Sequence, residues 1–271
     1  MLRARIIPCL LVHQGGLVKT RQFRNPKYVG DPINAVRIFN EKEADELMVL
    51  DIDASAQGNG PDFQLIEKLA AECSMPLCYG GGVTSAEQVK RIVDMGVEKV
   101  AISSAAVNDP SILNEMATKV GRQSVVAVLD VRKCKGLFSH GYEVCTHNAT
   151  RTIETSPIEL AKQMQQEGAG EIVVNFVDED GVMQGYDLGF AKSIGDISTV
   201  PLTFLGGAGS LEHLGQLLQE LGVVGAAAGS LFVFKGKYRA VLINYPPRNE
   251  KIAICENAKS GHMFEGKNVG K

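Results

Sequence analysis

Short apolar runs alternate with amphipathic stretches along nearly the whole chain. The runs that we expect to be strands lie at residues 4–12, 47–53, 76–79, 99–102, 125–129, 171–176, 202–205 and 225–232. Helical spacing follows most of them, as in residues 61–73, where Leu65, Leu69 and Ala70 share one face. Strands that are apolar throughout are typical of parallel sheets buried on both faces. Eight such units predict an α/β fold, a closed (β/α)8 TIM barrel rather than an open sheet.

An internal repeat supports the barrel. Gly80 and Gly206 stand 126 residues apart (206 − 80), and Ser103 and Gly229 have the same separation (229 − 103). Two half-barrels of four units each would give this spacing.

Three segments depart from the alternation. Residues 15–30 are polar and basic, and they predict a long loop. Residues 132–155 exceed what a strand–helix loop needs, and their alternation around Gly136 and Gly141 predicts a β-hairpin inserted over the barrel's top after the fifth strand. We assign residues 1–246 to the barrel and residues 247–271, which are polar and rich in lysine and glycine, to a mobile tail.

Composition narrows the functional classes. The chain has 271 residues, 45% of them hydrophobic and 22% charged, and its net charge is −3. This charge gives no general attraction to nucleic acid, and no apolar run is long enough to cross a membrane. The basic and then apolar N-terminus lacks the cleavage site of a signal peptide. Six cysteines without CxxC pairing indicate free thiols in the cytoplasm, and we expect no disulfide between Cys134 and Cys145.

Glycine-rich strand ends are the clearest chemical signal. Glycine lets a backbone approach an anion closely, and free N–H groups at a helix start can bind it. Tight turns without a ligand would explain one such loop, but two copies related by the repeat favour a substrate with two phosphates. Lys19 is either a further phosphate ligand or a solvated loop lysine. The residues concerned are Gly81, Gly82, Ser103 and Ser104 in one copy, and Gly206, Gly207, Gly229 and Ser230 in the other.

Carboxylates also follow the strands, at Asp51, Asp53, Asp130, Asp178 and Asp180. The carboxyl ends of the strands form the active face of a TIM barrel, so two facing acids there would suit general acid–base catalysis. Solvated loop carboxylates are the alternative, which we prefer for Asp178 and Glu179.

Four charged residues stand at or just before the starts of strands: Arg5, Glu46, Lys99 and Glu171. They could form a ring across the bottom of the barrel. From the residues alone, surface ion pairs of little energetic weight are the preferred interpretation.

The chain resembles the cyclase subunit of imidazole glycerol phosphate synthase, the HisF family, up to about Phe234. The matching stretches include RIIPCL, ADELMVLDI, GGGV, SSAAV, VVAVLD, GAGEI, GGAG and GSLFVF. The resemblance implies a (β/α)8 barrel and a lyase-type cyclase. It also implies a separate HisH-like glutaminase that docks on the bottom face, from which ammonia passes through the barrel to a phosphate-bearing small molecule at the top. No metal or cofactor is implied.

The resemblance assigns roles to residues. It makes Arg5, Glu46, Lys99 and Glu171 the charged gate of the ammonia entrance, which replaces our interpretation of them as surface ion pairs. It places Asp130 as one of two catalytic aspartates. Substrate and phosphate positions fall on Lys19, Gly82, Ser104, Asp180, Gly181, Gly207 and Ser230.

The second catalytic aspartate of the family falls on Leu11, which cannot transfer a proton. Further departures at the top are Asp53, Cys78 with Tyr79, and Asn175. This pattern is similar to paralogues associated with surface-polysaccharide biosynthesis, which implies ammonia delivery to a sugar amidotransferase acting on an N-acetyl sugar of lipopolysaccharide. Two other hypotheses stay open: a working cyclase of histidine biosynthesis, and a non-catalytic scaffold that activates the glutaminase.

Overall fold

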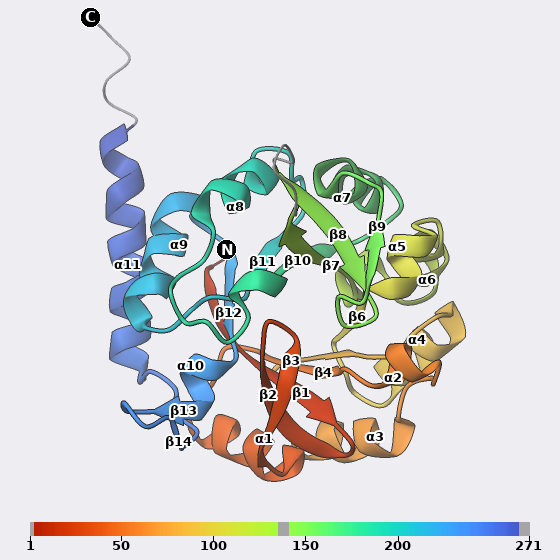
Figure 1. The fold of residues 1–271 in the computed structure, drawn as a ribbon, viewed down its shortest axis with the longest axis horizontal. Coiled ribbons are helices and arrows are strands. Elements are labelled where there is room, and N and C mark those ends of the chain that lie inside the picture. The colour runs from red at the N-terminus through yellow and green to blue at the C-terminus, as the bar shows by residue number, and fades with distance from the viewer. Residues whose placement is uncertain (1–2, 135–140, 266–271) are drawn as a thin grey trace, which may run out of the picture.

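Eight parallel strands close into a barrel in the computed structural model, which describes residues 3–134 and 141–265. The strands pair in the ring order β1, β4, β5, β6, β7, β10, β11 and β12, and the pairing of β12 with β1 completes the circle (Figure 1). The predicted TIM barrel is therefore confirmed. The strand bounds are β1 Arg5–His13, β4 Leu47–Asp51, β5 Leu77–Gly80, β6 Lys99–Ile102, β7 Val125–Lys133, β10 Glu171–Phe176, β11 Leu202–Leu205 and β12 Gly225–Ala228.

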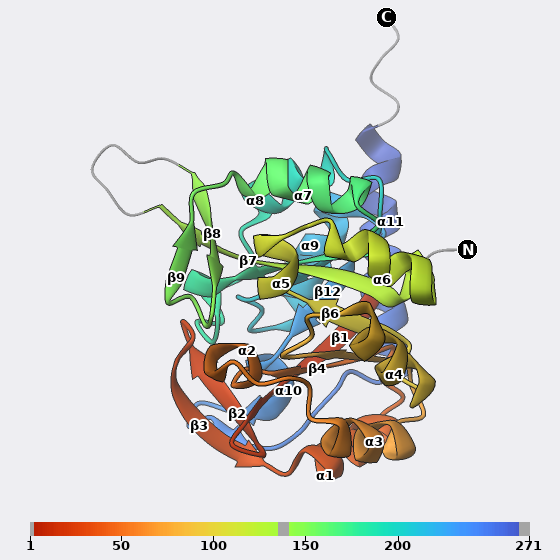
Figure 2. The same ribbon diagram turned by 90° about the vertical axis from the view of Figure 1, so that its right-hand side faces the viewer.

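Helices surround the barrel on its outside (Figures 1 and 2). Their starts follow local chemistry. The Asp31 carboxylate accepts a hydrogen bond from the Asn34 N–H, and Pro32 occupies the first helical position of α1. The bounds are α1 Pro32–Glu41, α2 Ala54–Gln57, α3 Phe63–Glu72, α4 Ala86–Asp94, α5 Ser104–Asn108, α6 Ile112–Val120, α7 Pro157–Gln166, α8 Leu188–Gly195, α9 Leu211–Leu221 and α10 Ser230–Val233.

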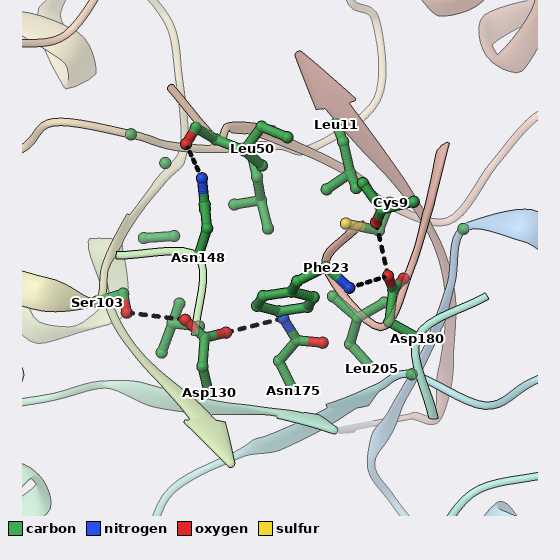
Figure 3. A pocket seen from close by; sticks show the side chains of 18 of the residues that line it. Cys9, Leu11, Phe23, Leu50, Ser103, Asp130, Asn148, Asn175, Asp180 and Leu205 are labelled. Carbon is green, nitrogen blue, oxygen red and sulfur yellow. Dashed lines mark hydrogen bonds between the residues drawn. The ribbon is translucent and has the colours of Figure 1, made fainter. Parts of the chain in front are cut away.

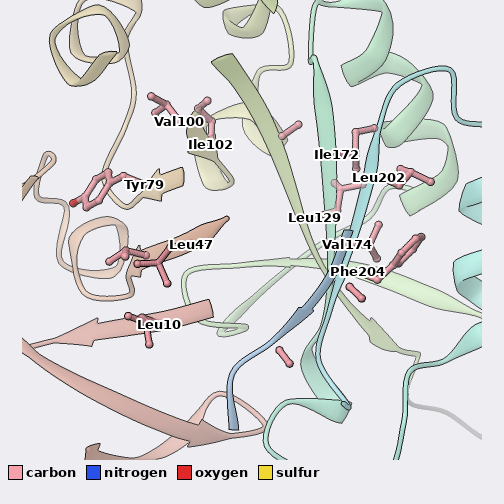
Figure 4. Packing of buried hydrophobic residues seen from close by; sticks show 14 of the residues in the cluster. Leu10, Leu47, Tyr79, Val100, Ile102, Leu129, Ile172, Val174, Leu202 and Phe204 are labelled. Carbon is pink, nitrogen blue, oxygen red and sulfur yellow. The ribbon is translucent and has the colours of Figure 1, made fainter. Parts of the chain in front are cut away.

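Each barrel strand sends alternate side chains outward and inward. The outward side chains pack against the helices in one large core, which includes Leu10, Leu47, Leu129 and Phe204 (Figure 4). The inward side chains form a second, separate apolar cluster, which we call the lumen cluster. It contains Ile7, Cys9, Met48, Cys78, Ala101, Val126, Val128, Val173, Leu205 and Ala227, with Leu11 and Leu50 partly buried against it.

The predicted repeat is visible in equivalent elements of the two halves. Helix α5 begins at Ser104 directly after β6, and α10 begins at Ser230 directly after β12. The Gly80 end of β5 corresponds in the same way to Gly206, which follows β11. The two halves therefore place similar loops at the same end of the barrel.

Two hairpins rise from the carboxyl ends of the strands (Figure 2). The expected loop at residues 15–30 is instead a hairpin of β2 (Gly16–Arg21) and β3 (Arg24–Gly30), which continues antiparallel from β1. Our prediction failed because β2 is buried continuously from Leu17 to Thr20 whereas β3 is largely exposed, so neither strand shows the alternation of apolar and polar side chains that marks a strand in the sequence. The hairpin predicted after the fifth strand is confirmed as β8 (Tyr142–Thr146) and β9 (Arg151–Ile153). Gly136 lies outside the described residues.

The C-terminal region also differs from expectation. After α10, a short hairpin of β13 (Phe234–Lys235) and β14 (Ala240–Val241) leads to helix α11 (Arg248–Glu265), where we had expected a tail. Helix α11 runs beside α9 (Figure 1). Lys251 fastens it to the barrel by donating to the Asp45 carboxylate at 2.9 Å and to the Glu43 carbonyl at 2.7 Å. Within the described ranges, no helix is long and apolar enough to cross a membrane, and the six cysteines are free thiols.

Tyr245 should contribute measurably to stability. Its buried hydroxyl donates to the Ile6 carbonyl at 2.8 Å and accepts from the Asp45 N–H at 3.1 Å. We expect Tyr245→Phe to lower the free energy of unfolding by about 1–2 kcal/mol, because it leaves buried polar groups without a partner. Urea unfolding checks this. Tyr238→Phe is the control, because Tyr238 is 92% exposed; equal losses in both variants would contradict the account.

Candidate functional site

A pocket opens at the carboxyl ends of the barrel strands, where the strand–helix loops and the two hairpins meet. It gathers the residues that we assigned to catalysis and to substrate or phosphate binding, from both halves of the chain. These are Lys19, Gly81, Gly82, Ser103, Ser104, Asp130, Asp180, Gly181, Gly206, Gly207, Gly229 and Ser230. Of the other carboxylates at this end, Asp51 lines the pocket and Asp53 and Asp178 do not. The repeat therefore brings its two glycine-rich copies to a single site.

Asp130, on β7, is the principal ionisable group of the pocket floor. Its carboxylate accepts a hydrogen bond from the Asn175 amide at 2.8 Å and one from the Ser103 hydroxyl at 3.3 Å (Figure 3). Burial raises the pKa of Asp130 to about 6, although the hydrogen bonds from Asn175 and Ser103 oppose the rise. Such a carboxyl can both hold and release a proton near neutral pH.

The opposite wall of the pocket is apolar. Leu11 and Leu50 lie across from Asp130 in Figure 3, on adjacent strands that pair at these two positions. Cys9 and Leu205 continue this surface toward the barrel interior. The pocket therefore presents Asp130 without a second carboxylate at the position that faces it.

The glycines of the two loops are required by backbone packing. Gly82 has φ +69°, and a Cβ atom there would come within 2.5 Å of the Asn59 carbonyl oxygen. Gly207 has φ +109°, and a Cβ atom there would approach the Gly185 carbonyl oxygen to 2.0 Å. Tight turns thus account for glycine at these positions. Our prediction of a phosphate site therefore depends on the shared position of the two loops at the pocket rather than on their glycine content.

Lys19 projects from β2 into the pocket and is only 5% exposed. Its ammonium donates to the Cys9 carbonyl at 2.6 Å and lies beside Gly229. Burial lowers the pKa of Lys19, although Cys9 and Asp180 nearby oppose this effect. Lys19 is therefore a buried side chain beside one of the glycine-rich loops, and not a solvated loop lysine.

The other carboxylates mostly hold the loops in place. Asp51 accepts from the backbone N–H groups of Asp53 and Ala54, and Asp53 pairs with His13 at 2.7 Å. The Asp178 carboxylate accepts from the Lys133 N–H, so it is not merely solvated as we had expected. Asp180 accepts from the Thr20 hydroxyl at 2.6 Å and from the Phe23 N–H at 3.1 Å, which ties the β2–β3 hairpin to the loop after β10.

The sequence did not reveal the residues that the hairpin turns add to the pocket. Phe23 reaches in from the β2–β3 turn and Asn148 from the β8–β9 turn (Figure 3), and His147 of the latter turn also lines the pocket. The Asn148 amide donates to the Ile52 carbonyl at 2.8 Å. All three residues have positive φ, a conformation that glycine adopts most readily. Neither turn contains a glycine, so the usual sequence signal of a tight turn is absent.

At the opposite end of the barrel, the four predicted charged residues form one ion network, which we call the four-charge cluster. Arg5 lies 2.5 Å from the Glu46 carboxylate and 2.8 Å from that of Glu171. Lys99 lies 2.9 Å from Glu46 and 2.8 Å from Glu171. Thr203 donates to Glu171 at 2.5 Å. Each cation thus contacts both anions across the amino ends of four strands.

The four-charge cluster is largely buried, so it is not a set of surface ion pairs. The Glu46 and Glu171 side chains are 3% and 6% exposed, and those of Arg5 and Lys99 about a fifth. Burial alone would raise the pKa of Glu171, but the hydrogen bonds and charges of Arg5 and Lys99 hold it below its usual range. Burial works against the Lys99 ammonium, yet the two glutamates raise its pKa. Glu171 and Lys99 are therefore charged at neutral pH.

The four-charge cluster, the lumen cluster and the pocket follow one another along the barrel axis. Along β1, the inward positions run from Arg5 in the four-charge cluster through Ile7 and Cys9 of the lumen cluster to Leu11 at the pocket. The interior thus changes from charged to apolar and then to a polar cavity. Among the residues that the structure describes, no group of three or more potential ligands is arranged to hold a metal ion.

Comparison with known proteins gives a consistent result. Residues 5–239 match the family described as histidine biosynthesis protein. The chain is 57% identical over 254 residues to a protein of Leptospira interrogans provisionally named imidazole glycerol phosphate synthase subunit HisF, which covers 94% of this chain and 99% of that protein. A provisionally named counterpart from Vibrio vulnificus is 56% identical, covering 94% and 98%. Imidazole glycerol phosphate synthase subunit HisF of Hyphomonas neptunium is 39% identical, covering 86% and 91%.

The raised pKa of Asp130 predicts a pH-dependent stability. The folded chain binds this proton more tightly than the unfolded chain, whose carboxyl titrates near its ordinary 3.8. The stability from protonated Asp130 is present below that value and is lost as the pH rises through about 6. We expect Asp130→Asn to exceed the wild type by about 3 kcal/mol in free energy of unfolding at neutral pH and nearly to match it near pH 4.

Urea unfolding at the two pH values measures this difference. Asp94→Asn is the control, because the Asp94 side chain is 59% exposed. If the free energy of unfolding depends on pH in the same way in the wild type and in Asp130→Asn, the pKa of the Asp130 carboxyl is not raised and the account is contradicted.

Proposed function

The chain belongs to the histidine biosynthesis protein family, and we propose that it is the barrel subunit of a glutamine amidotransferase complex. In this proposal a HisH-like glutaminase docks at the bottom of the barrel and releases ammonia at the four-charge cluster. The ammonia crosses the lumen cluster and leaves through the top pocket. The observation that carries the proposal is the combination of an intact charged bottom and apolar interior with a pocket in which Leu11 faces Asp130.

The interior has the chemistry that this transfer needs. An apolar passage admits neutral ammonia far more readily than the ammonium ion, because burying an unpaired charge is costly. The side chains of the lumen cluster, between the four-charge cluster and the pocket, are aliphatic, thiol or thioether groups. At the bottom, Lys99 has a long flexible stem and bridges two carboxylates. Its displacement by a docked partner would open the way into the lumen without unfolding a strand.

We further propose that the ammonia acceptor is an N-acetyl sugar of O-antigen or lipopolysaccharide biosynthesis, amidated by a separate enzyme. Leu11 supports this, because leucine can neither donate nor accept a proton. The chain is also more similar to two provisionally named relatives, at 57% and 56% identity, than to the Hyphomonas protein, at 39%. This difference is expected if the chain and those two relatives form a branch that has diverged from the HisF enzymes.

A second candidate function is the cyclase reaction itself, in which the formimino-linked ribulosyl-aminoimidazole phosphate substrate and ammonia give imidazole glycerol phosphate. It is supported by the names of the relatives, by the two glycine-rich loops at one pocket and by Asp130, whose pKa of about 6 suits proton transfer. Asp130 would then act alone in general acid–base catalysis.

One assay distinguishes the two functions. The purified chain is supplied with the ribulosyl-aminoimidazole substrate and ammonium salt, with a HisF enzyme that has both aspartates as the positive control. We expect imidazole glycerol phosphate formation to be slower by at least about a hundredfold, the usual loss when a general acid or base is absent. A rate equal to that of the control would refute the sugar-amidation proposal and establish the cyclase.

The four-charge cluster gives a second prediction. In a complex reconstituted with glutaminase and sugar amidotransferase, Lys99→Ala should reduce glutamine-dependent amidation by about tenfold or more, equivalent to about 1.4 kcal/mol. Amidation supported by added ammonium salt should stay the same, because that ammonia need not enter at the bottom.

The control is Lys90→Ala, which removes an exposed lysine paired only with Asp94 within its own helix. Circular dichroism establishes that both variants are folded, since losing Lys99 leaves buried carboxylates less well compensated. Unchanged glutamine-dependent transfer in Lys99→Ala would count against conduction through the barrel and favour a scaffold that only activates the glutaminase.

A further inference from the structure

The β2–β3 and β13–β14 hairpins, on one side of the pocket mouth, are rich in basic residues and contain no acids of their own. Residues 14–30, which include β2 and β3, contain no aspartate or glutamate, and neither do residues 229–249, which include β13 and β14. This is unusual in a chain whose net charge is −3. The cations on this surface, which we call the basic rim, are Arg21, Arg24, Lys27, Lys235, Lys237 and Arg239.

The β2–β3 and β13–β14 hairpins meet at Phe234. The Lys27 ammonium lies 5.4 Å from the centre of the Phe234 ring, and the Arg239 guanidinium lies 4.9 Å from it. Arg239 also donates to the Gly181 carbonyl at 3.3 Å, and Gly181 packs on Thr20 of β2. Segments that are more than 200 residues apart in the sequence therefore form one continuous surface.

The basic rim also carries exposed apolar side chains. Six large hydrophobic residues are exposed in the part of the chain that the structure describes, and four of them lie here. Their exposed fractions are 66% for Tyr28, 92% for Tyr238, 45% for Val241 and 52% for Leu242. Exposed tyrosines among arginines are typical of protein interfaces, in which these two residue types are enriched and often dominate the binding energy.

The position of the rim constrains what can bind there. Its β2–β3 hairpin is also a wall of the pocket, because Lys19, Thr20 and Phe23 line the cavity. Gly181, to which Arg239 is bonded, lines it as well. A macromolecule seated on the rim would therefore cover the pocket mouth.

We propose that the basic rim docks an acidic face of the enzyme that consumes the ammonia; this inference rests on the proposed function. Ammonia released into water at neutral pH is protonated and diluted, so delivery requires a second protein to seal the mouth. Two hairpins whose charged residues are all basic select an acidic partner by electrostatic complementarity and speed its association. An anionic lipid surface could also bind these cations, but it would not accept ammonia. The position of the basic rim at the pocket mouth therefore favours a protein partner.

Site-specific photo-crosslinking in the source organism tests this. A benzophenone amino acid replaces Tyr28 in one strain and Tyr238 in another, and crosslinked products are identified by mass spectrometry. Val223 and Ile252, which are 49% and 46% exposed and lie outside the rim, are the control positions. We expect both tyrosine positions, and neither control, to crosslink to an amidotransferase with an acidic surface. Crosslinks to the glutaminase, to lipid or to nucleic acid, or none at all, would overturn the proposal.

The crosslinked enzyme then allows a quantitative test. Arg24→Glu with Lys237→Glu should weaken its binding to the complex by about tenfold or more, with a strong dependence on salt. The control pair Lys42→Glu with Lys68→Glu makes the same charge change at exposed positions at the end of α1 and on α3.

Failure of this proposal is distinguishable from failure of the proposed function. If the wild type delivers glutamine nitrogen and the rim variant does so equally well, the docking surface is elsewhere and the function stands. If the wild type delivers no glutamine nitrogen to the identified enzyme, the proposed function itself fails.

Discussion

The buried four-charge cluster is the interaction on which this account depends. Removing two cations and two anions from water costs several kcal/mol per ion, which their mutual attraction offsets only with good geometry. Here each cation contacts both anions at hydrogen-bonding distance. Apolar residues of similar volume would often stabilise such a site as well or better. Four charges at the centre of the barrel's amino end are therefore better explained by a role in transport than by stability.

The rest of the interior follows from the alternation of side chains along the strands. Because every second residue points inward, one end of β1 contributes Arg5 to the ion network and the other contributes Leu11 to the pocket. The bottom retains its full set of charges, whereas the top has Asp130 without a facing acid. Because different residues on the same strands form the two ends, one end can change without the other, which is what our proposal requires.

Much of this arrangement could be predicted from the sequence. Apolar strands at regular intervals predicted the closed barrel, and glycine-rich ends related by the repeat predicted one shared pocket. The segments outside the barrel strands could not be predicted in this way. Neither the β2–β3 ribbon nor helix α11 has a strong apolar period, so tertiary contacts such as that of Lys251 with Asp45 determine their structure. Phe23 and Asn148 were missed for the same reason, since their turns lack glycine and are held by contacts to distant loops.

The central claim is that glutamine nitrogen travels inside the protein. It is tested most directly by isotope competition in the reconstituted complex, with glutamine labelled by nitrogen-15 in its amide and unlabelled ammonium in large excess in solution. Conduction through the barrel predicts that the amidated sugar carries mostly nitrogen-15, since channelled ammonia does not mix with the solvent. A product whose label is diluted to the ratio in the bulk solution would contradict the account.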